Sequence, residues 1–274
     1  MTDAPQHTQA QAAPGPVGDA AAPPIVEMNH VHLAFDKRVI LKDLTLSVAR
    51  RERLVIMGQS GGGKSTTLRL ILGILHPNAG SIRFNGEEVT RMTRPRLNRM
   101  RQGIGMVYQY SALISSLSVR DNLALPLEEL TTKSRKEIDA IVEEKLTLVG
   151  MQDTRSYMPA QLSGGMKKRI GLARALVLNP ELILFDEPSA GLDPVVSSVI
   201  DELIISLTEK TNATSIIVTH EMDSAFRVAT RMAMLYQGKI IEEDTPDRFR
   251  SSSDAVVSQF VEGRTDGPIN TTRN

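Results

Sequence analysis

A lysine and a serine directly follow a run of glycines at residues 58–65, which read GQSGGGKS. This stretch fits the pattern G-x-x-x-x-G-K-[ST], whose backbone N–H groups surround a phosphate. Lys64 can reach the β- and γ-phosphates of a nucleoside triphosphate, and the Ser65 hydroxyl can bind Mg²⁺. The residues predicted to contact the nucleotide here are Gly58, Gln59, Ser60, Gly61, Gly62, Gly63, Lys64, Ser65 and Thr66. A glycine-rich turn without a ligand is the alternative.

Two acidic residues close an apolar run at residues 182–187. Asp186 ends a predicted buried strand, where an unpaired carboxylate is costly, and Mg²⁺ bridging two phosphates is its natural partner. Glu187 follows and points to the other side of the strand end, where it can polarise the water that attacks the γ-phosphate. These residues predict phosphoryl transfer to water, in which positioning and charge stabilisation supply most of the catalysis.

The elements that must position these residues are short strands and helices. The apolar runs predicted as strands are residues 53–57, 104–108, 182–187 and 215–219. Residues 66–72 and 167–177 predict helices, and the first of them completes the strand, loop and helix order that a phosphate-binding loop needs. A chain of 274 residues can carry one large α/β domain plus short extras.

The middle of the chain predicts a hairpin and a helical region. Asn85 and Gly86 lie between two runs that suit strands, which is a hairpin signal. Residues 91–101 are rich in arginine, and a solvated helix face explains them better than a binding site does. Residues 109–150 are predicted to be helical, with a capping box at Ser134 and Glu137.

Composition narrows the classes of function. Lys and Arg total 32, as do Asp and Glu, and this balance argues against a nucleic-acid binder. No stretch approaches roughly eighteen consecutive apolar residues, so none is predicted to span a membrane. Cysteine is absent, which suits a reducing compartment. Residues 1–24 contain no Lys or Arg, fit neither a secretory signal nor a transit peptide, and are predicted to be a disordered tail.

The order of these motifs, together with LSGGM at residues 162–166, resembles the ATP-binding-cassette (ABC) ATPases over residues 25–243. The resemblance implies a P-loop NTPase fold, the ABC nucleotide-binding domain: a RecA-like core, an antiparallel β subdomain and an α-helical subdomain at about residues 110–177. Residues 244–274 are then expected to form a C-terminal helix and extension. The residues that match the family signature are Leu162, Ser163, Gly164, Gly165 and Met166.

The resemblance also implies roles within the nucleotide site. Residues 182–187 resemble the Walker B strand, and Asp193 lies in a segment that resembles the D-loop. The residues expected to act in catalysis are Glu187, His220 as the switch histidine, and Gln109 as the Q-loop glutamine. Those expected to hold Mg²⁺ are Ser65, Gln109 and Asp186. Phe35 lies where relatives place an aromatic side chain that stacks on adenine, and a phenylalanine of the core is the alternative.

The signature predicts a second subunit. Ser163 opens a predicted helix whose free N–H groups make a second anion site, which a single phosphate-binding loop does not require. In ABC ATPases this site faces the nucleotide held by the partner. The chain has no internal repeat, so the resemblance implies a homodimer of this chain that holds two ATP molecules between P-loop and signature. The expected cofactors are ATP and Mg²⁺.

Two segments narrow the kind of transporter. Residues 108–119 and 258–269 are similar to the Mla/Mce/TGD lipid-transport ATPases, with departures at Ser111 (Gly in that group) and Ile114 (Phe in that group). This similarity implies an ATPase peripheral to the cytoplasmic face of a bacterial inner membrane. Its expected partners are an integral membrane permease, an Mce-domain substrate-binding protein and a STAS-type regulator. Residues 110–117 would contact the permease or join the core.

Other transporters and other classes of protein share part of this pattern. The ATPase of an amino-acid or other small-solute importer has every core motif and is the alternative. A soluble ABC ATPase that acts on ribosomes or DNA is disfavoured, because such proteins usually carry two cassettes or long coiled-coil inserts. No nucleic-acid partner is expected. The end of the chain would either reach the neighbouring subunit or fray.

Overall fold

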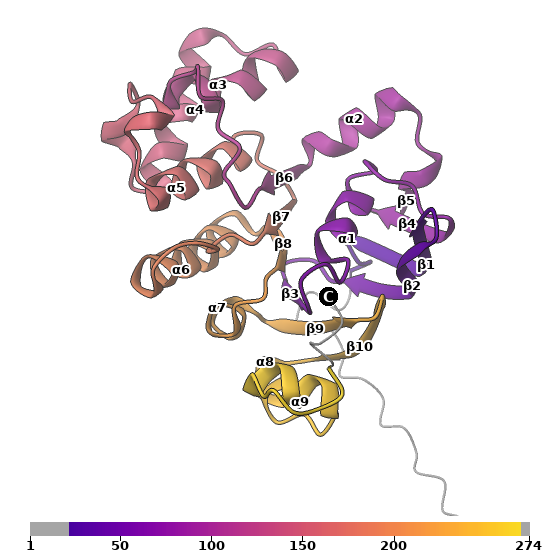
Figure 1. The fold of residues 1–274 in the computed structure, drawn as a ribbon. Coiled ribbons are helices and arrows are strands. Elements are labelled where there is room, and N and C mark those ends of the chain that lie inside the picture. Colours follow the sequence, from indigo (N-terminus) through magenta and orange to yellow (C-terminus); the bar gives the residue numbers. More distant parts are fainter. Residues whose placement is uncertain (1–21, 270–274) are drawn as a thin grey trace, which may run out of the picture.

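The computed structural model describes residues 22–269, and two sheets organise this part of the chain (Figure 1). The larger sheet has six strands in the order β10-β9-β3-β8-β7-β6. Its strands are β3 (Arg53–Met57), β6 (Ile104–Val107), β7 (Leu182–Asp186), β8 (Thr214–Val218), β9 (Arg231–Tyr236) and β10 (Lys239–Asp244). All neighbours are parallel except β10, which is antiparallel to β9. The carboxyl ends of β3, β6, β7 and β8 therefore meet at one edge, where open α/β sheets bind ligands.

A smaller antiparallel sheet, in the order β2-β1-β4-β5, completes the strands. Its members are β1 (Val26–Phe35), β2 (Arg38–Val48), β4 (Ala79–Phe84) and β5 (Glu87–Glu88). The predicted hairpin is confirmed: β4 and β5 pair on either side of Asn85 and Gly86, whose φ values are 51° and 77°. Two central residues with positive φ are typical of a type I′ turn, whose twist matches that of the paired strands.

The helices of the described residues are α1 (Lys64–Ile71), α2 (Arg94–Gln102), α3 (Val119–Leu130), α4 (Arg135–Leu148), α5 (Gly164–Ala175), α6 (Pro194–Thr211), α7 (Met222–Val228), α8 (Pro246–Arg250) and α9 (Ala255–Glu262). Short 3-10 turns lie at Val89–Arg91, Gln152–Thr154 and Pro159–Gln161. Helices α3, α4 and α5 pack together at one end of the molecule, apart from the smaller sheet (Figure 1). No helix within residues 22–269 has both the length and the apolar character needed to cross a bilayer.

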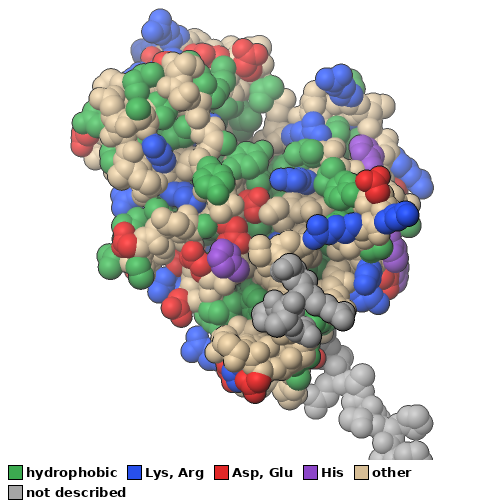
Figure 2. Space-filling model, in the orientation of Figure 1, with side chains coloured by type: hydrophobic (Ala, Val, Ile, Leu, Met, Phe, Trp, Pro, Cys, Tyr) green, Lys and Arg blue, Asp and Glu red, His purple; other side chains and the backbone are tan. Residues whose placement is uncertain are grey.

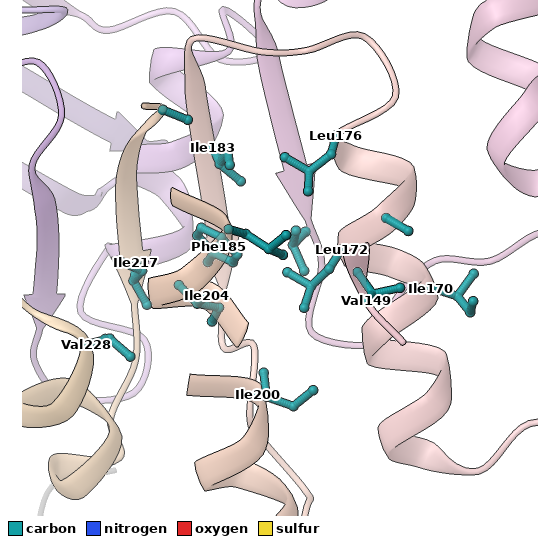
Figure 3. Close-up of a cluster of buried hydrophobic side chains, with 14 of the residues drawn as sticks. Val149, Ile170, Leu172, Leu176, Ile183, Phe185, Ile200, Ile204, Ile217 and Val228 are labelled. Carbon is teal, nitrogen blue, oxygen red and sulfur yellow. The ribbon is translucent and has the colours of Figure 1, made fainter. Parts of the chain in front are cut away.

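The parallel strands of the larger sheet are buried on both faces, so they read as largely continuous apolar runs, whereas the edge strand β10 does not. Alternate residues of β3 face opposite sides: Val55 packs with the helices, and Leu54 packs with the smaller sheet and α1. Phe185 of β7 lies on the helical side, in a cluster that includes Leu172 of α5 and Ile204 of α6 (Figure 3). Burial of each such side chain contributes about 1.5–3 kcal/mol. This packing fixes the strand ends that carry the predicted site.

The prediction of a helix from residue 109 onward is wrong for residues 109–118, which form turns. Ser111 and Ala112 have left-handed φ values of 59° and 46°, and an α-helix does not allow such values. Helix α3 begins only after Ser118, whose side chain caps its first turn. The rest of the predicted region is helical in α3 and α4 but not at residues 131–134 and 149–150, and the capping box before α4 is confirmed.

The arginine-rich segment forms α2, and Lys and Arg side chains gather over this helix and the neighbouring sheet (Figure 2). Arg96 pairs with Glu87 at 2.7 Å, as expected of a solvated face. Arg101 departs from that prediction, because its guanidinium donates to the Leu72 and Gly73 carbonyls at 2.9 and 3.1 Å. It therefore binds the carbonyls that the end of α1 leaves free.

The two predicted terminal segments lie partly outside the described residues. Of the predicted tail at residues 1–24, residues 22–24 are described and lead into β1. Of the predicted extension, residues 264–269 are described and follow α9, which ends at a left-handed Gly263 as its glycine suggests.

Candidate nucleotide-binding site

The glycine loop lines a cavity of about 440 Å³ at the carboxyl end of β3. Gly58 has a φ of 149°, and a Cβ there would collide with the Leu235 carbonyl, so only glycine fits. Gly63, with a φ of 103°, precedes α1, which begins at Lys64 rather than at the predicted residue 66. The residues that line the cavity are Arg38, Ile40, Ser60, Gly61, Gly63, Lys64, Ser65, Thr66, Gln109, Glu187 and His220. The structure thus brings the predicted phosphate loop and the three predicted catalytic residues together.

Lys64 is held in this cavity by its own loop. Its Nζ donates to the Gly58 carbonyl at 2.8 Å and to the Gln59 carbonyl at 3.1 Å, and the residue is buried. Burial lowers the pKa of the Lys64 ammonium, while the charges of Glu187 and Asp186 oppose that shift. An ammonium has three N–H donors, so two of them fix Lys64 against the loop and one is left for a phosphate.

Ser65 and Asp186 meet where α1 begins and β7 ends. The Ser65 hydroxyl donates to Asp186 Oδ1 at 2.7 Å. A hydroxyl and a carboxylate are the oxygen ligands that Mg²⁺ prefers, and this ion commonly takes one or two carboxylates together with substrate phosphates. Within residues 22–269 no three His, Cys, Asp or Glu side chains form a complete metal cage. The residues present therefore fit Mg²⁺ that arrives with a nucleotide.

Glu187 and His220 form a pair at the ends of β7 and β8. Both carboxylate oxygens of Glu187 lie 2.9 Å from His220 Nδ1. The Glu187 side chain is 12 % exposed and that of His220 is 58 % exposed. Glu187 has a left-handed φ of 51°, and its N–H donates to the Val218 carbonyl at 2.9 Å. Non-glycine residues in this conformation cost about 1–3 kcal/mol and cluster at functional sites. The backbone therefore turns Glu187 out of the strand direction and into the cavity.

Two residues of β2, Arg38 and Ile40, line the cavity although the sequence did not point to them. Arg38 pairs with Phe35 across the turn between β1 and β2. Phe35 is 47 % exposed, so the alternative of a core phenylalanine is wrong, and its stacking on adenine stays a prediction. The sequence signal that could have identified Arg38 is its position three residues after Phe35, the aromatic residue expected to stack on adenine.

The signature and the D-loop aspartate lie outside this cavity. None of residues 162–166, all described, lines it. Ser163 caps α5 by accepting the Met166 N–H at 3.3 Å, so α5 begins before the predicted residue 167. Asp193 caps α6 and accepts the Val196 N–H at 3.0 Å. The start of α5 therefore lies outside the cavity that the chain's own phosphate loop lines.

A buried polar network beside His220 was not predicted. Ser189 donates to Glu221 at 2.8 Å, while Ser224 and Arg227 each donate to Asp201 at 2.6 Å. Burial raises the pKa of the Asp201 carboxyl, and the bonds from Ser224 and Arg227 oppose that shift. The network ties α6 to α7, so it holds the segment that follows the histidine. Such long-range contacts have no sequence signal.

Comparison with known proteins places these features in context. A family model described as ABC transporter matches residues 41–190. The chain is 39 % identical over 245 residues to the "Intermembrane phospholipid transport system ATP-binding protein MlaF" of Haemophilus influenzae, covering 89 % of this chain and 93 % of that protein. It is 40 % identical over 244 residues to the "Probable ribonucleotide transport ATP-binding protein mkl" of Mycobacterium tuberculosis, covering 89 % and 68 %.

Among solved structures, a dimer of the ATP-binding cassette MJ0796 in a post-hydrolysis state with ADP and Pi is similar to this chain. The TM-score is 0.73 with 30 % sequence identity, and the match covers 81 % of this chain and 98 % of that one.

Proposed function

The chain belongs to the ABC transporter ATPases, and from that premise we propose how its site hydrolyses ATP and which transport the hydrolysis drives. The predicted fold, the ABC nucleotide-binding domain of the P-loop NTPases, is confirmed by the family match and the structural likeness. ATP binding and ATP hydrolysis follow from family membership. The assignment of steps to residues rests on the cavity described above.

The phosphate loop and Lys64 hold the β- and γ-phosphates. Backbone N–H groups of the loop and the N-terminus of α1 would bind the anion, and the Lys64 ammonium would add a positive charge. Ser65, Asp186 and Gln109 would hold Mg²⁺, which would neutralise phosphate charge. We propose that Phe35, which is exposed and pairs with Arg38, stacks on the adenine.

Glu187 is the general base in this proposal. Its carboxylate accepts a proton from water as the water oxygen bonds to the γ-phosphorus and the bond to the bridging oxygen breaks. His220 donates its Nδ1–H to the carboxylate and so orients it. The observation that carries the proposal is this pair, 2.9 Å apart and inside the cavity that the phosphate loop lines.

A second copy of the chain completes the site. The signature helix opens an anion site that lies outside the chain's own cavity, so a γ-phosphate can reach it only on another subunit. MJ0796, a relative of similar fold, forms a dimer after hydrolysis. We infer a homodimer that ATP closes and hydrolysis loosens.

The permease contact is the surface of the Q-loop, which comprises residues 108–119. Tyr110 is 85 % exposed, and the large side chains of Ile114 and Tyr108 are also exposed. The alternative of core packing for residues 110–117 does not hold for Tyr110 and Ile114, whereas Leu113 packs against the core. An exposed group of aromatic and aliphatic side chains is typical of a protein interface.

Phospholipid is the proposed cargo, in an Mla/Mce-type system. Residues 108–119 and 258–269 support it, as does the likeness to MlaF of Haemophilus influenzae. The chain would act at the cytoplasmic side of a bacterial inner membrane, with a permease, an Mce-domain protein and a STAS-type regulator. The relative described as a probable ribonucleotide transporter keeps import of a small solute as the second candidate.

The substitution Glu187→Gln tests the catalytic assignment. The amide cannot take the proton, so we expect turnover to fall by roughly 10²–10⁴-fold while ATP binding is retained. The variant should accumulate as an ATP-bound dimer on size-exclusion chromatography. Glu181→Gln, before the opposite end of β7, is the matched control and should keep normal turnover. Near-normal activity of Glu187→Gln would remove that residue from its role.

The cargo is tested by purification from the native host. The tagged chain is extracted from detergent-solubilised membranes, and the proteins and lipids that accompany it are identified by mass spectrometry. A permease with an Mce-domain protein and phospholipid supports the lipid proposal. A permease with a small-solute-binding protein would move the function to solute import, and the absence of any membrane protein would contradict both.

A further inference from the structure

Helix α5, which begins at the signature, contacts the Q-loop through two cationic side chains. Lys168 Nζ donates to the Gln109 carbonyl at 2.6 Å. Arg174, almost two turns further along, donates to the Ser111 carbonyl at 2.9 Å and to the Ala112 carbonyl at 2.7 Å. The Q-loop backbone is therefore bonded to α5 at both ends of its first turn.

The same lysine also contacts the catalytic strand end. Lys168 Nζ donates to the Glu187 carbonyl at 3.2 Å, and Lys168 is only 6 % exposed. Burial lowers the pKa of the Lys168 ammonium, while the charges of Glu221 and Glu187 oppose the shift. One buried ammonium thus joins three segments that are far apart in sequence: the signature helix, the Q-loop and the residue proposed as the general base.

Both segments that Lys168 binds contain non-glycine residues in the left-handed backbone conformation. Ser111 and Ala112 in the Q-loop and Glu187 after β7 all have left-handed φ values, of 59°, 46° and 51°. Such conformations persist only where surrounding contacts hold them. Gly171 lies between the two cations, and a Cβ on it would be 3.3 Å from the Ser111 Cβ, so α5 and the Q-loop are also closely packed.

We propose that Lys168 is a positioning residue that links the Q-loop to Glu187, so that displacement of the Q-loop changes the position of the catalytic carboxylate. The inference rests on the proposed roles of Glu187 and of the Q-loop surface. A permease that moves Tyr110 and its neighbours would shift the position of the Gln109 carbonyl. Because Lys168 is bonded to that carbonyl and to the Glu187 carbonyl, Glu187 would move as well. Lys168 touches neither water nor phosphate in this scheme and acts through Glu187.

The test is Lys168→Met, which keeps most of the length of the side chain and removes its donors. We expect kcat for ATP hydrolysis by the full-length chain to fall about 10- to 100-fold, because small misplacements of catalytic groups cost this much. KM for ATP should stay within about twofold, because Lys168 does not line the cavity. Lys168→Arg, which keeps a charged donor, should restore most of kcat.

Lys145→Met is the matched control. Lys145 lies on α4, is 4 % exposed, and donates to Asn179 and Glu144 at 2.8 Å, so it is an equally buried ammonium without contact to the Q-loop. We expect Lys145→Met to lower the melting temperature and leave kcat unchanged. An equal fall of kcat in Lys145→Met would make the loss a general effect of removing a buried ammonium and would overturn the inference.

A spectroscopic readout follows the Q-loop directly. The chain contains no tryptophan, so Tyr110→Trp places a single reporter in this loop. The change of its emission on adding ATP should be smaller in Lys168→Met than with Lys168 present, because the loop no longer follows the site. An equal emission change, or a kcat of Lys168→Met within twofold of the parent, would contradict the link.

Two further variants keep the outcome decisive. If Lys168→Met does not fold, Lys168→Gln takes its place, because its side-chain amide keeps a hydrogen-bond donor. We expect Lys168→Gln to lower kcat by a smaller factor. An unchanged kcat would contradict the link. Glu187→Gln is assayed in parallel. If it is inactive while Lys168→Met is normal, only the link fails, whereas normal turnover of Glu187→Gln would remove the proposed general base.

Discussion

Lys64 and Lys168 are both buried lysines that donate to backbone carbonyls, but their acceptors lie at different distances along the chain. Lys64 bonds two carbonyls of its own loop, five and six residues away. Lys168 bonds the carbonyls of Gln109 and Glu187, 59 and 19 residues away. Lys64 therefore keeps its place wherever the glycine loop forms, whereas the position of Lys168 depends on three segments at once.

This difference separates two parts of the site. The phosphate side is built from adjacent residues at the end of a strand that is buried on both faces, so it is preformed. The Q-loop side is held by long-range bonds to strained turns and exposes Tyr110, so it is the side that can respond to a partner. Substitutions on the first side should change ATP affinity, and those on the second should change turnover.

The largest effect on ATP affinity should come from Lys64→Met. Loss of a charged hydrogen bond to phosphate costs about 1.5–3 kcal/mol, which corresponds to roughly a 10- to 100-fold weaker Kd for ATP. The free energy of unfolding should change little, because the lost bonds join Lys64 only to its own loop. Isothermal titration with ATP and chemical denaturation measure the two quantities.

Lys145→Met serves again as the control for Lys64, since it should leave ATP affinity unchanged. If Lys64→Met and Lys168→Met weakened ATP binding by the same factor, the two lysines would not differ in the way proposed, and the comparison would fail.

The sequence predicted the phosphate side better than the Q-loop side for a physical reason. The bounds of β3 and the convergence of Lys64, Glu187 and His220 follow from a short motif and from parallel strands that end at one edge. The turn at Ser111 was missed, because nothing adjacent forces a serine into a left-handed conformation. Arg174, which donates to the Ser111 carbonyl, is 63 residues away and leaves no local pattern.

A smaller effect is expected from Gly171→Ala. Alanine favours the helix by about 1 kcal/mol, but its Cβ would be 3.3 Å from the Ser111 Cβ, so one side must move by a few tenths of an ångström. The Q-loop should move, because α5 is anchored in the core. We therefore expect kcat to fall a few-fold, while the free energy of unfolding changes by less than about 1 kcal/mol.

A double variant provides the control for Gly171→Ala. Ser111→Gly removes the Cβ that the new methyl group would meet, so Gly171→Ala with Ser111→Gly should recover most of the lost kcat. Steady-state kinetics on the two single variants and the double variant measure this coupling. Additive effects would mean that the close contact between α5 and the Q-loop does not govern turnover.

The smallest effect should come from Ser111→Gly alone. The left-handed φ of 59° at Ser111 costs a side-chain-bearing residue about 1–2 kcal/mol. Glycine avoids that cost but loses roughly 0.5–1 kcal/mol more conformational entropy on folding. The net expectation is a gain of about 0–1 kcal/mol in the free energy of unfolding, measured by urea denaturation, with ATP affinity unchanged. Ser115→Gly is the control in the same loop, because Ser115 is exposed and lacks a positive φ. Ser115→Gly should leave the free energy of unfolding unchanged or lower it. Equal losses of this free energy in both variants would show that the Q-loop stores no backbone strain. The contrast with the preformed phosphate side would then rest on long-range hydrogen bonds alone.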